Sequence, residues 1–162
     1  MSVVLDIGPV ILDAEARPVG DVDIAMQILA ALTTAPAFSM DSYCENASRS
    51  GLTRADMEYY WDRYLADDVD RRHPCASRLY VREPLRLPPT IVVTAGVDLL
   101  WDDGIWYAEA LTDVDVPVDH VHAPDMSHAV LGYRYLDLGL DSSIEALDGV
   151  CDGLAHSFEE RS

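Results

Sequence analysis

The sequence TIVVTAGVDLLWDDGIWYAEALTDVDVPVDHVHAPDMSH, residues 90–128, decides the fold class. It opens with a β-branched run that follows two prolines and precedes Gly96, a pattern typical of a buried strand. Residues 102–112 are predicted to form a helix, and residues 116–122 alternate as a second strand does. A last helix, opened by a capping box, is expected over residues 142–159. Because strand and helix alternate, we expect parallel strands and an α/β fold.

The elements before this stretch are less regular. Residues 24–32 form an apolar run that periodicity assigns neither to a strand nor to a helix. Residues 36–50 are predicted to form a loop. Residues 53–65 are predicted to form a helix, because they begin like a capping box with Asp56 in the place of the usual Glu. Residues 66–89 contain four prolines and are predicted to be mostly irregular.

The composition indicates one globular domain with a strongly negative charge. Hydrophobic residues make up 49% of the 162 residues, so we expect a single ordered domain over residues 1–162. The 29 acidic residues outnumber 11 basic residues, all of them Arg, and the net charge is −18. This charge repels phosphate and argues against nucleic acid and anionic membranes as partners. It favours a halophilic protein of a salty cytoplasm, with an acidic mesophilic protein as the alternative.

Two further features concern location and redox state. No stretch is apolar enough to cross a membrane, and the first six residues lack the basic start of a signal peptide, so we expect a cytoplasmic protein. Cys44, Cys75 and Cys151 are widely spaced without a Cys-x-x-Cys motif. This excludes a disulfide framework and a zinc knuckle, and it predicts that each cysteine is a small packed hydrophobic residue.

Two residues capable of acid–base chemistry follow the two predicted strands. Asp98 comes three residues after the first strand, and His128 comes after the second. Because the carboxyl ends of parallel strands meet at one rim of a sheet, we expect these side chains to lie close together. A carboxylate can hold an imidazole in one tautomer and stabilise the imidazolium that forms when the ring takes a proton. The alternative is that Asp98 caps the following helix and His128 is an ordinary loop residue.

A set of short motifs, spread in order along the chain, points to a known family. The motifs are Asn46, Leu52-Thr53-Arg54-Ala55-Asp56-Met57, Trp61-Asp62-x-Tyr64-Leu65, Pro74-x-Ala76-Ser77, Leu87-Pro88-Pro89, Asp98-x-Leu100-x-Asp102-x-Gly104, Tyr107-Ala108-Glu109-Ala110-Leu111, Val116-Pro117-Val118 and Met126-x-His128. With them, residues 24–160 resemble the C-terminal portion of the hormone-sensitive-lipase-like (α/β-hydrolase fold-3) family of carboxylesterases and lipases. The resemblance implies a partial α/β-hydrolase fold with a helical cap insert, a small acyl ester as substrate, and no cofactor.

The resemblance also implies a division of the chain and a role for each part. Residues 1–23 would be the remnant of the helix that follows the nucleophile, residues 40–77 the cap insert, and residues 88–160 the part that carries the catalytic acid and histidine. Asp98 matches the acid of the catalytic triad and His128 its base. The cap aromatic residues are expected to line the acyl pocket in part, with ordinary packing of cap against body as the alternative. These residues are Tyr60, Trp61 and Tyr64.

The sequence departs from the family where the nucleophile is needed. No serine has glycine at both flanking positions, as the Gly-x-Ser-x-Gly elbow requires, and Ser2 has no strand before it. The glycine-rich oxyanion loop is not found either, and its donors alone are commonly worth about 3 kcal/mol of barrier. Around the histidine, Asp125 and Ala129-Val130 replace the usual glycine and Gly-Phe. We therefore predict a chain that is inactive by itself.

The missing nucleophile elbow also predicts an unpaired edge in the sheet. If residues 24–32 form the strand that normally pairs with the nucleophile strand, their other edge is open and available for association. The chain would then be a truncated remnant, a homo-oligomer, or a subunit that pairs with a separate N-terminal chain supplying the serine.

Metal binding is a weaker alternative. His120 and His122 share one strand face at a spacing that a metal ion accepts, but only two ligands are evident. The acidic segment 67–70 lacks the glycine and terminal glutamate of a calcium loop and is interpreted as a solvated turn. We therefore predict no metal site.

Overall fold

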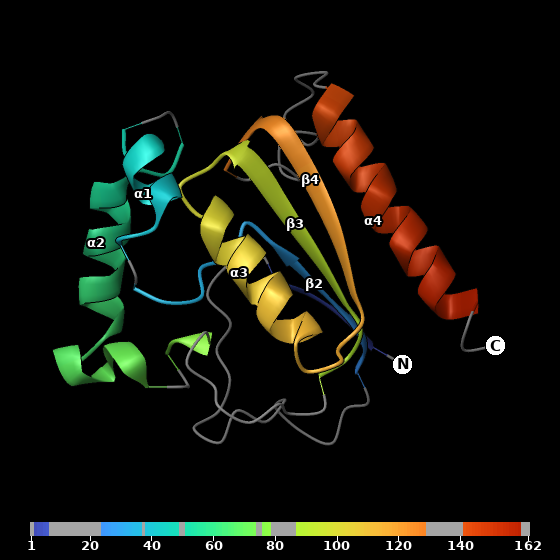
Figure 1. Ribbon diagram of the computed structural model, residues 1–162, viewed down its shortest axis with the longest axis horizontal. Coiled ribbons are helices and arrows are strands. Elements are labelled where there is room, and N and C mark those ends of the chain that lie inside the picture. The colour runs from blue at the N-terminus through green and yellow to red at the C-terminus, as the bar shows by residue number, and fades with distance from the viewer. Residues whose placement is uncertain are drawn as a thin grey trace.

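The computed structural model describes residues 2–6, 24–36, 38–48, 51–73, 76–78, 87–128 and 141–159. Within them, one parallel sheet has the strand order β1-β2-β3-β4 (Figure 1). The strands are β1 (Ser2–Asp6), β2 (Ile24–Ala30), β3 (Thr90–Val97) and β4 (Val118–Ser127). The predicted α/β class and both C-terminal strands are confirmed, and β4 extends five residues beyond the predicted end at His122.

Two helices cover opposite faces of this sheet (Figure 1). Helix α3 (Trp101–Thr112) packs Ala108 against Val92, and helix α4 (Asp141–Glu159) packs on the face that carries Ile91 and Val93. Successive residues of a strand point to opposite faces, and all three of these β3 side chains are fully buried. An uninterrupted β-branched run is therefore what this strand needs, because both of its faces are covered.

The segment expected to form the cap contains helices α1 (Asp41–Glu45) and α2 (Arg54–Tyr64) and the short 3-10 helix η1 (Asp68–Arg72). Helix α2 begins at the predicted capping box, in which the Thr53 hydroxyl accepts a hydrogen bond from the Asp56 backbone N–H. Helix α1 was not predicted, because its N-cap residue Met40 makes no side-chain capping bond and the element has only five residues.

The N-terminal residues correct two predictions. Ser2–Asp6 form a strand instead of part of a helix remnant, and residues 7–23 of the expected remnant lie outside the described residues. This strand pairs in parallel with Ile24–Leu29, so the prediction of an open edge at β2 is wrong. The run Val3-Val4-Leu5 has a high preference for strands, which accounts for the difference.

Two further findings concern the surface. No helix among the described residues has the length and apolar character that a bilayer span requires. Cys44 and Cys151 are exposed, so the prediction that they are packed hydrophobic residues is wrong, and Cys75 lies outside the described residues. Both exposed cysteines lie on helices, where the sequence pattern did not show which side faces solvent.

Candidate active site

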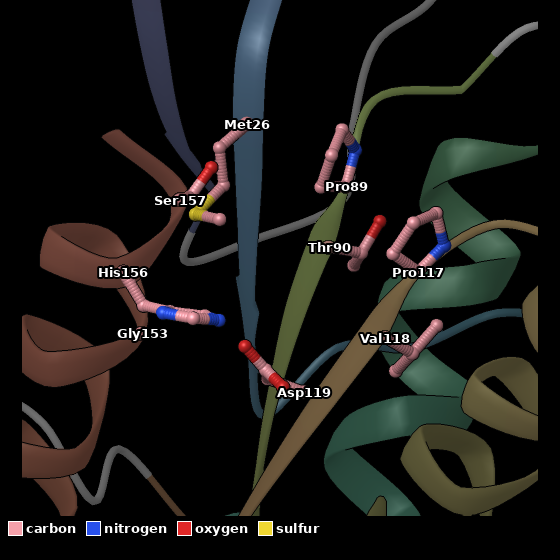
Figure 2. Close-up of a pocket in the computed structure, with 9 residues that line it drawn as sticks. All are labelled: Met26, Pro89, Thr90, Pro117, Val118, Asp119, Gly153, His156 and Ser157. Atoms are coloured by element: carbon pink, nitrogen blue, oxygen red, sulfur yellow. The ribbon is translucent and has the colours of Figure 1, made fainter. Parts of the chain in front are cut away.

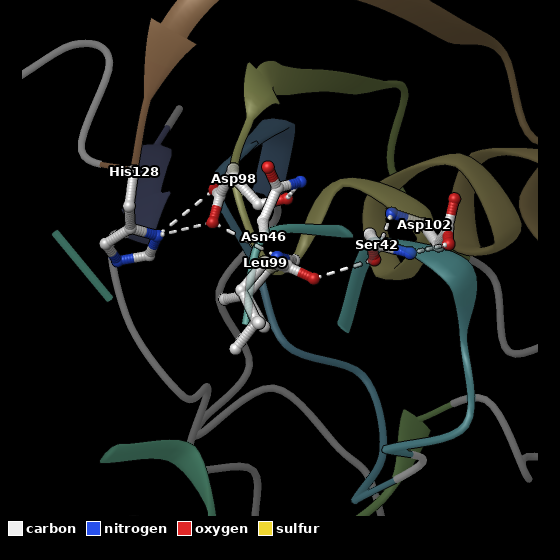
Figure 3. A network of polar contacts seen from close by, with 7 residues as sticks. Ser42, Asn46, Asp98, Leu99, Asp102 and His128 are labelled. Atoms are coloured by element: carbon white, nitrogen blue, oxygen red, sulfur yellow. Dashed lines mark hydrogen bonds and ion pairs between the residues drawn. The ribbon is translucent and has the colours of Figure 1, made fainter. Parts of the chain in front are cut away.

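The structure brings Asp98 and His128 together at the carboxyl ends of β3 and β4. His128 Nδ1 lies 3.1 Å from Asp98 Oδ2 and 3.2 Å from Oδ1. The Asp98 side chain is 1% exposed, whereas that of His128 is 30% exposed. Figure 3 shows the Nδ1 edge of the imidazole turned toward the carboxylate and the second ring nitrogen turned away from it. With Asp98 ionised, Nδ1 is the donor and Nε2 can accept a proton from a neighbouring group.

A close approach of the two strands places these residues within reach of each other. The register of β3 and β4 shifts between Ala95 and Val97, where Gly96 lies against the backbone of Pro124. A Cβ atom at Gly96 would lie 2.3 Å from the Pro124 carbonyl oxygen, a distance that no side chain tolerates. Irregularities of this kind re-aim side chains at the ends of strands.

Asp98 also stabilises the turn that leads into α3. The backbone N–H of Leu100 donates to Asp98 Oδ1 at 3.1 Å, and the N–H of Trp101 donates to the Asp98 carbonyl at 3.4 Å. The N-cap residue of α3 is Leu100 and no side chain caps this helix, so the alternative that Asp98 is a helix cap is wrong, and its carboxylate closes the turn before the helix. A carboxylate can accept about four hydrogen bonds, so the turn and the imidazole share it.

Ser42 of α1 and Asn46, the C-cap residue of that helix, hold the same loop from the other side, and the sequence indicated no role for either (Figure 3). Asn46 Nδ2 donates to the Asp98 carbonyl at 3.0 Å, and Ser42 Oγ donates to the Leu99 carbonyl at 2.7 Å. The Ser42 N–H donates to Asp102 Oδ2 at 2.8 Å. Asn46 and Asp102 stand in the motifs of the resemblance, but nothing in the sequence indicates that Asn46 bonds to the Asp98 carbonyl or that Asp102 bonds to Ser42.

The three aromatic residues of α2 that were expected to line an acyl pocket differ in exposure. Trp61 is 4% exposed and belongs to a buried cluster with Leu99 and Leu100, which supports the packing alternative for this residue. Tyr60 and Tyr64 are 55% and 44% exposed. A role for these tyrosines in lining an acyl pocket stays a prediction.

The two histidines of β4 share one hydroxyl group. His120 Nε2 and His122 Nδ1 each lie 2.8 Å from Thr94 Oγ1, and the His122 ring stacks on Trp101 at 5.5 Å. Partial burial and the neighbouring His122 lower the pKa of His120. The part of the chain that the structure describes contains no group of three side chains suited to a metal ion.

A pocket of about 230 Å³ lies at the opposite rim of the sheet (Figure 2). Thr90 and Val118, at the amino ends of β3 and β4, line it together with the last turns of α4. Asp119 and His156 face each other across it. The length of both strands therefore separates this pocket from the Asp98–His128 pair.

Comparison with known proteins places this geometry in a family. Residues 10–132 match the family described by its α/β hydrolase fold. The esterase LipI of Mycobacterium tuberculosis is 34% identical over 125 residues, which are 76% of this chain and 39% of LipI. The carboxylesterase NlhH of the same species is 32% identical over 134 residues, which are 81% of this chain and 41% of NlhH. The gibberellin receptor GID1C of Arabidopsis thaliana is 33% identical over 89 residues, 52% of this chain and 25% of the receptor.

Solved structures agree with the sequence relatives. A thermostable esterase from Pseudomonas putida ECU1011 has a TM-score of 0.74 at 28% identity, covering 84% of this chain and 43% of the esterase. A fungal esterase from Rhizomucor miehei has a TM-score of 0.76 at 28% identity, covering 84% of this chain and 42% of that protein. The chain thus spans about two fifths of the length of these esterases. It belongs to the hormone-sensitive-lipase-like, or fold-3, family of α/β-hydrolases.

Proposed function

We propose that this chain carries the acid and histidine of a carboxylic-ester hydrolase that acts on small acyl esters. The observation that supports this most directly is the contact of His128 Nδ1 with the buried carboxylate of Asp98, at 3.1 and 3.2 Å, in a chain related to esterases. Asp98 holds the imidazole in the Nδ1–H tautomer, which leaves Nε2 as the general base. The segment 40–77 is the cap that shapes the acyl pocket.

The reaction is acyl transfer through a serine ester. Nε2 of His128 takes the proton of the serine hydroxyl while the serine oxygen bonds to the ester carbonyl carbon, and then gives that proton to the departing alcohol. A water molecule then attacks the carbonyl carbon of the serine ester while Nε2 takes its proton. Nε2 returns that proton to the serine oxygen, and the carboxylic acid is released. None of the serines in these 162 residues lies in a Gly-x-Ser-x-Gly elbow, so the nucleophile comes from additional polypeptide of the kind that the longer esterases possess. The 162-residue chain alone does not turn over substrate.

A second candidate is a non-catalytic subunit that binds another chain. Strand β1 is at the end of the strand order, and β2 is its one neighbour among the described residues. A parallel edge strand offers unpaired backbone groups to an added strand. A hetero-complex or a homo-oligomer would form through this edge, which replaces the β2 edge expected from the sequence.

A complementation assay distinguishes these functions. The chain is mixed with, or joined by a flexible linker to, the portion of the Pseudomonas putida esterase that precedes the matched region, and hydrolysis of p-nitrophenyl butyrate is followed. We expect activity in the mixture, none in either part alone, and a loss on the order of 10³-fold or more with His128→Ala. The matched control is His156→Ala, which changes an exposed histidine at the opposite rim.

Three outcomes contradict parts of the proposal. Hydrolysis by the isolated chain that His128→Ala abolishes would show that it has its own nucleophile. Hydrolysis in the mixture that survives His128→Ala would refute the role of the histidine. A discrete complex on size-exclusion chromatography without hydrolysis would favour the binding subunit.

The working environment proposed for the chain is a cytoplasm of high salt. The support is the net charge of −18 and the use of Arg for every basic residue. Salt screens the repulsion among these carboxylates, so the melting temperature should rise from dilute buffer to molar KCl. A melting temperature that does not change with salt would exclude a halophilic protein.

A further inference from the structure

Two buried hydrogen bonds, from Ser42 and Asn46, join the segment of helix α1 to the loop that carries Asp98, and we call this pair of bonds the latch. The carbonyl of residue 98 accepts the Asn46 side-chain N–H at 3.0 Å, and the carbonyl of residue 99 accepts the Ser42 hydroxyl at 2.7 Å. Asn46 is 4% exposed and Ser42 is 1% exposed, so water does not readily replace either donor. Two consecutive peptide groups of the loop that carries Asp98 are therefore oriented by a residue of α1 and by the C-cap residue of that helix.

The orientation of these peptide groups determines whether the Asp98 carboxylate receives a backbone hydrogen bond. The Leu100 N–H belongs to the peptide whose carbonyl Ser42 binds, and it donates to Asp98 Oδ1 at 3.1 Å. If the two peptide planes rotate, this N–H no longer points at the carboxylate. The carboxylate would then lose a donor that fixes its rotamer, and its contact with His128 Nδ1 would lengthen.

The same segment also borders the histidine. Gly51 has φ +112°, a backbone conformation that favours glycine, and a Cβ atom built there would lie 3.7 Å from His128 Cβ. Ser42 and Asn46 thus bond to the loop that carries the acid, and Gly51 lies near the histidine, with room for no more than an ordinary contact between them.

We infer that Asn46 is a positioning residue: through the Asp98 carbonyl it makes the Asp98–His128 hydrogen bond depend on how the α1 segment lies against the loop that carries Asp98. The geometric part stands on the contacts above, and its catalytic consequence rests on the proposed function. A displacement of α1, such as a bulky acyl group under the cap would cause, loosens the acid and the imidazole together. Substrate fit in the cap is thereby coupled to proton transfer at His128.

The first test measures the hydrogen bond itself in the 162-residue chain. The Nδ1–H resonance of His128 is identified in ¹⁵N-histidine spectra by its loss in His128→Ala. We expect Asn46→Ala to increase its exchange with solvent by on the order of 10-fold, the equilibrium change that about 1.4 kcal/mol produces. The matched control is Thr53→Ala, which removes the N-cap of α2 and weakens the same segment without touching the acid loop.

The outcomes separate positioning from general loss of stability. Equal exchange in the wild type and in folded Asn46→Ala would overturn the inference, as would an equal increase in Thr53→Ala. If Asn46→Ala does not fold, Ser42→Ala decides by the same measurement, because it removes the bond to the next carbonyl.

The second test uses the complemented enzyme. There, Asn46→Ala should lower kcat by on the order of 10-fold to 100-fold with little change in KM, whereas Thr53→Ala should leave kcat unchanged. If the wild-type mixture has no activity, the proposed function fails, but the exchange measurement still tests the latch. If kcat for Asn46→Ala equals that of the wild type, the latch has no catalytic role.

Discussion

Asp103 lies wholly buried in the first turn of α3, and its ionisation should make folding depend on pH. Its Oδ1 accepts hydrogen bonds from the Thr34 N–H at 2.8 Å and from the Thr34 hydroxyl at 2.7 Å. Its Oδ2 makes no well-formed hydrogen bond among the described residues, although the Tyr43 hydroxyl and the Ala35 N–H lie near the carboxylate. Burial raises the pKa of Asp103 from 3.8 to about 6, against the opposing effect of the Thr34 hydrogen bonds.

The magnitude follows from these two pKa values. A carboxyl group whose pKa is higher in the folded than in the unfolded chain binds its proton more tightly when folded, so protonation favours folding. The stabilising contribution of protonated Asp103 to the folded state is fully present below pH 3.8 and is lost as the pH rises through about 6. At about 1.4 kcal/mol for each tenfold change in the acid constant, ionised Asp103 costs the folded state about 3 kcal/mol at neutral pH.

The perturbation is Asp103→Asn, which preserves the shape of the side chain. The amide oxygen can still accept both Thr34 bonds, and an N–H donor replaces Oδ2 beside the buried hydroxyl groups of Tyr43 and Thr33. Burial, with the Asp103 carboxylate close by, raises the pKa of Tyr43, so this hydroxyl stays neutral. We therefore expect the variant to be more stable than the wild type by about 3 kcal/mol at pH 8 and nearly equal to it at pH 4.

The assay is urea unfolding of both proteins from pH 4 to pH 8 at constant high KCl. The control is Asp148→Asn, which removes the same charge from an exposed position on α4. A difference between Asp103→Asn and the wild type that is the same at pH 4 and pH 8 would refute the reasoning. So would a pH-dependent difference of equal size for the control.

Three further predictions concern backbone positions and a helix cap. Gly96→Ala should destabilise the fold by about 3 kcal/mol in urea unfolding, because the new Cβ meets the backbone of β4 at 2.3 Å and backbone cannot move aside as a side chain can. Gly149→Ala, inside α4, should instead stabilise the fold by about 1 kcal/mol, since its Cβ would make an ordinary contact with Val121 at 3.4 Å. A loss of stability with Gly149→Ala would contradict the packing of α4 on the sheet. Thr53→Ala should cost about 1 kcal/mol through the lost N-cap. Because hydrogen bonds from Thr53 lower the pKa of Asp56, the same change should move that pKa back toward its usual value of 3.8 in an NMR titration.

Local patterns were sufficient for most regular elements of the C-terminal half. The β-branched run of β3 and the capping box of α2 each act within a few residues, and the structure confirms both. Helix α4 also forms where it was predicted, but it begins at Asp141, so Ser142 lies inside its first turn and the predicted capping box is not confirmed. The short helix α1 could not be predicted in this way. It depends on Ser42 and Asn46 meeting a loop more than 50 positions away, an interaction that no local pattern records.

The sequence likewise predicted some features of the candidate site, whereas others are visible only in the structure. The positions of Asp98 and His128 after two parallel strands predicted their meeting, because topology alone brings such ends to one rim. Their catalytic roles stay predictions of the family resemblance. The hydrogen bonds from Ser42 and Asn46 and the need for glycine at residue 96 appear only when β3, β4 and the α1 segment are packed together.

By itself the amino-acid sequence determined the α/β class, the parallel order of the C-terminal elements and the pair of residues at their ends, because these depend on neighbours along the chain and on the handedness of crossovers. Only the tertiary structure decided which edge of the sheet is paired, which carboxylate is buried without charge compensation, and which residues hold the acid loop in place. Those features depend on contacts between segments distant in sequence, where the burial and the hydrogen-bond partners of a side chain are set by packing.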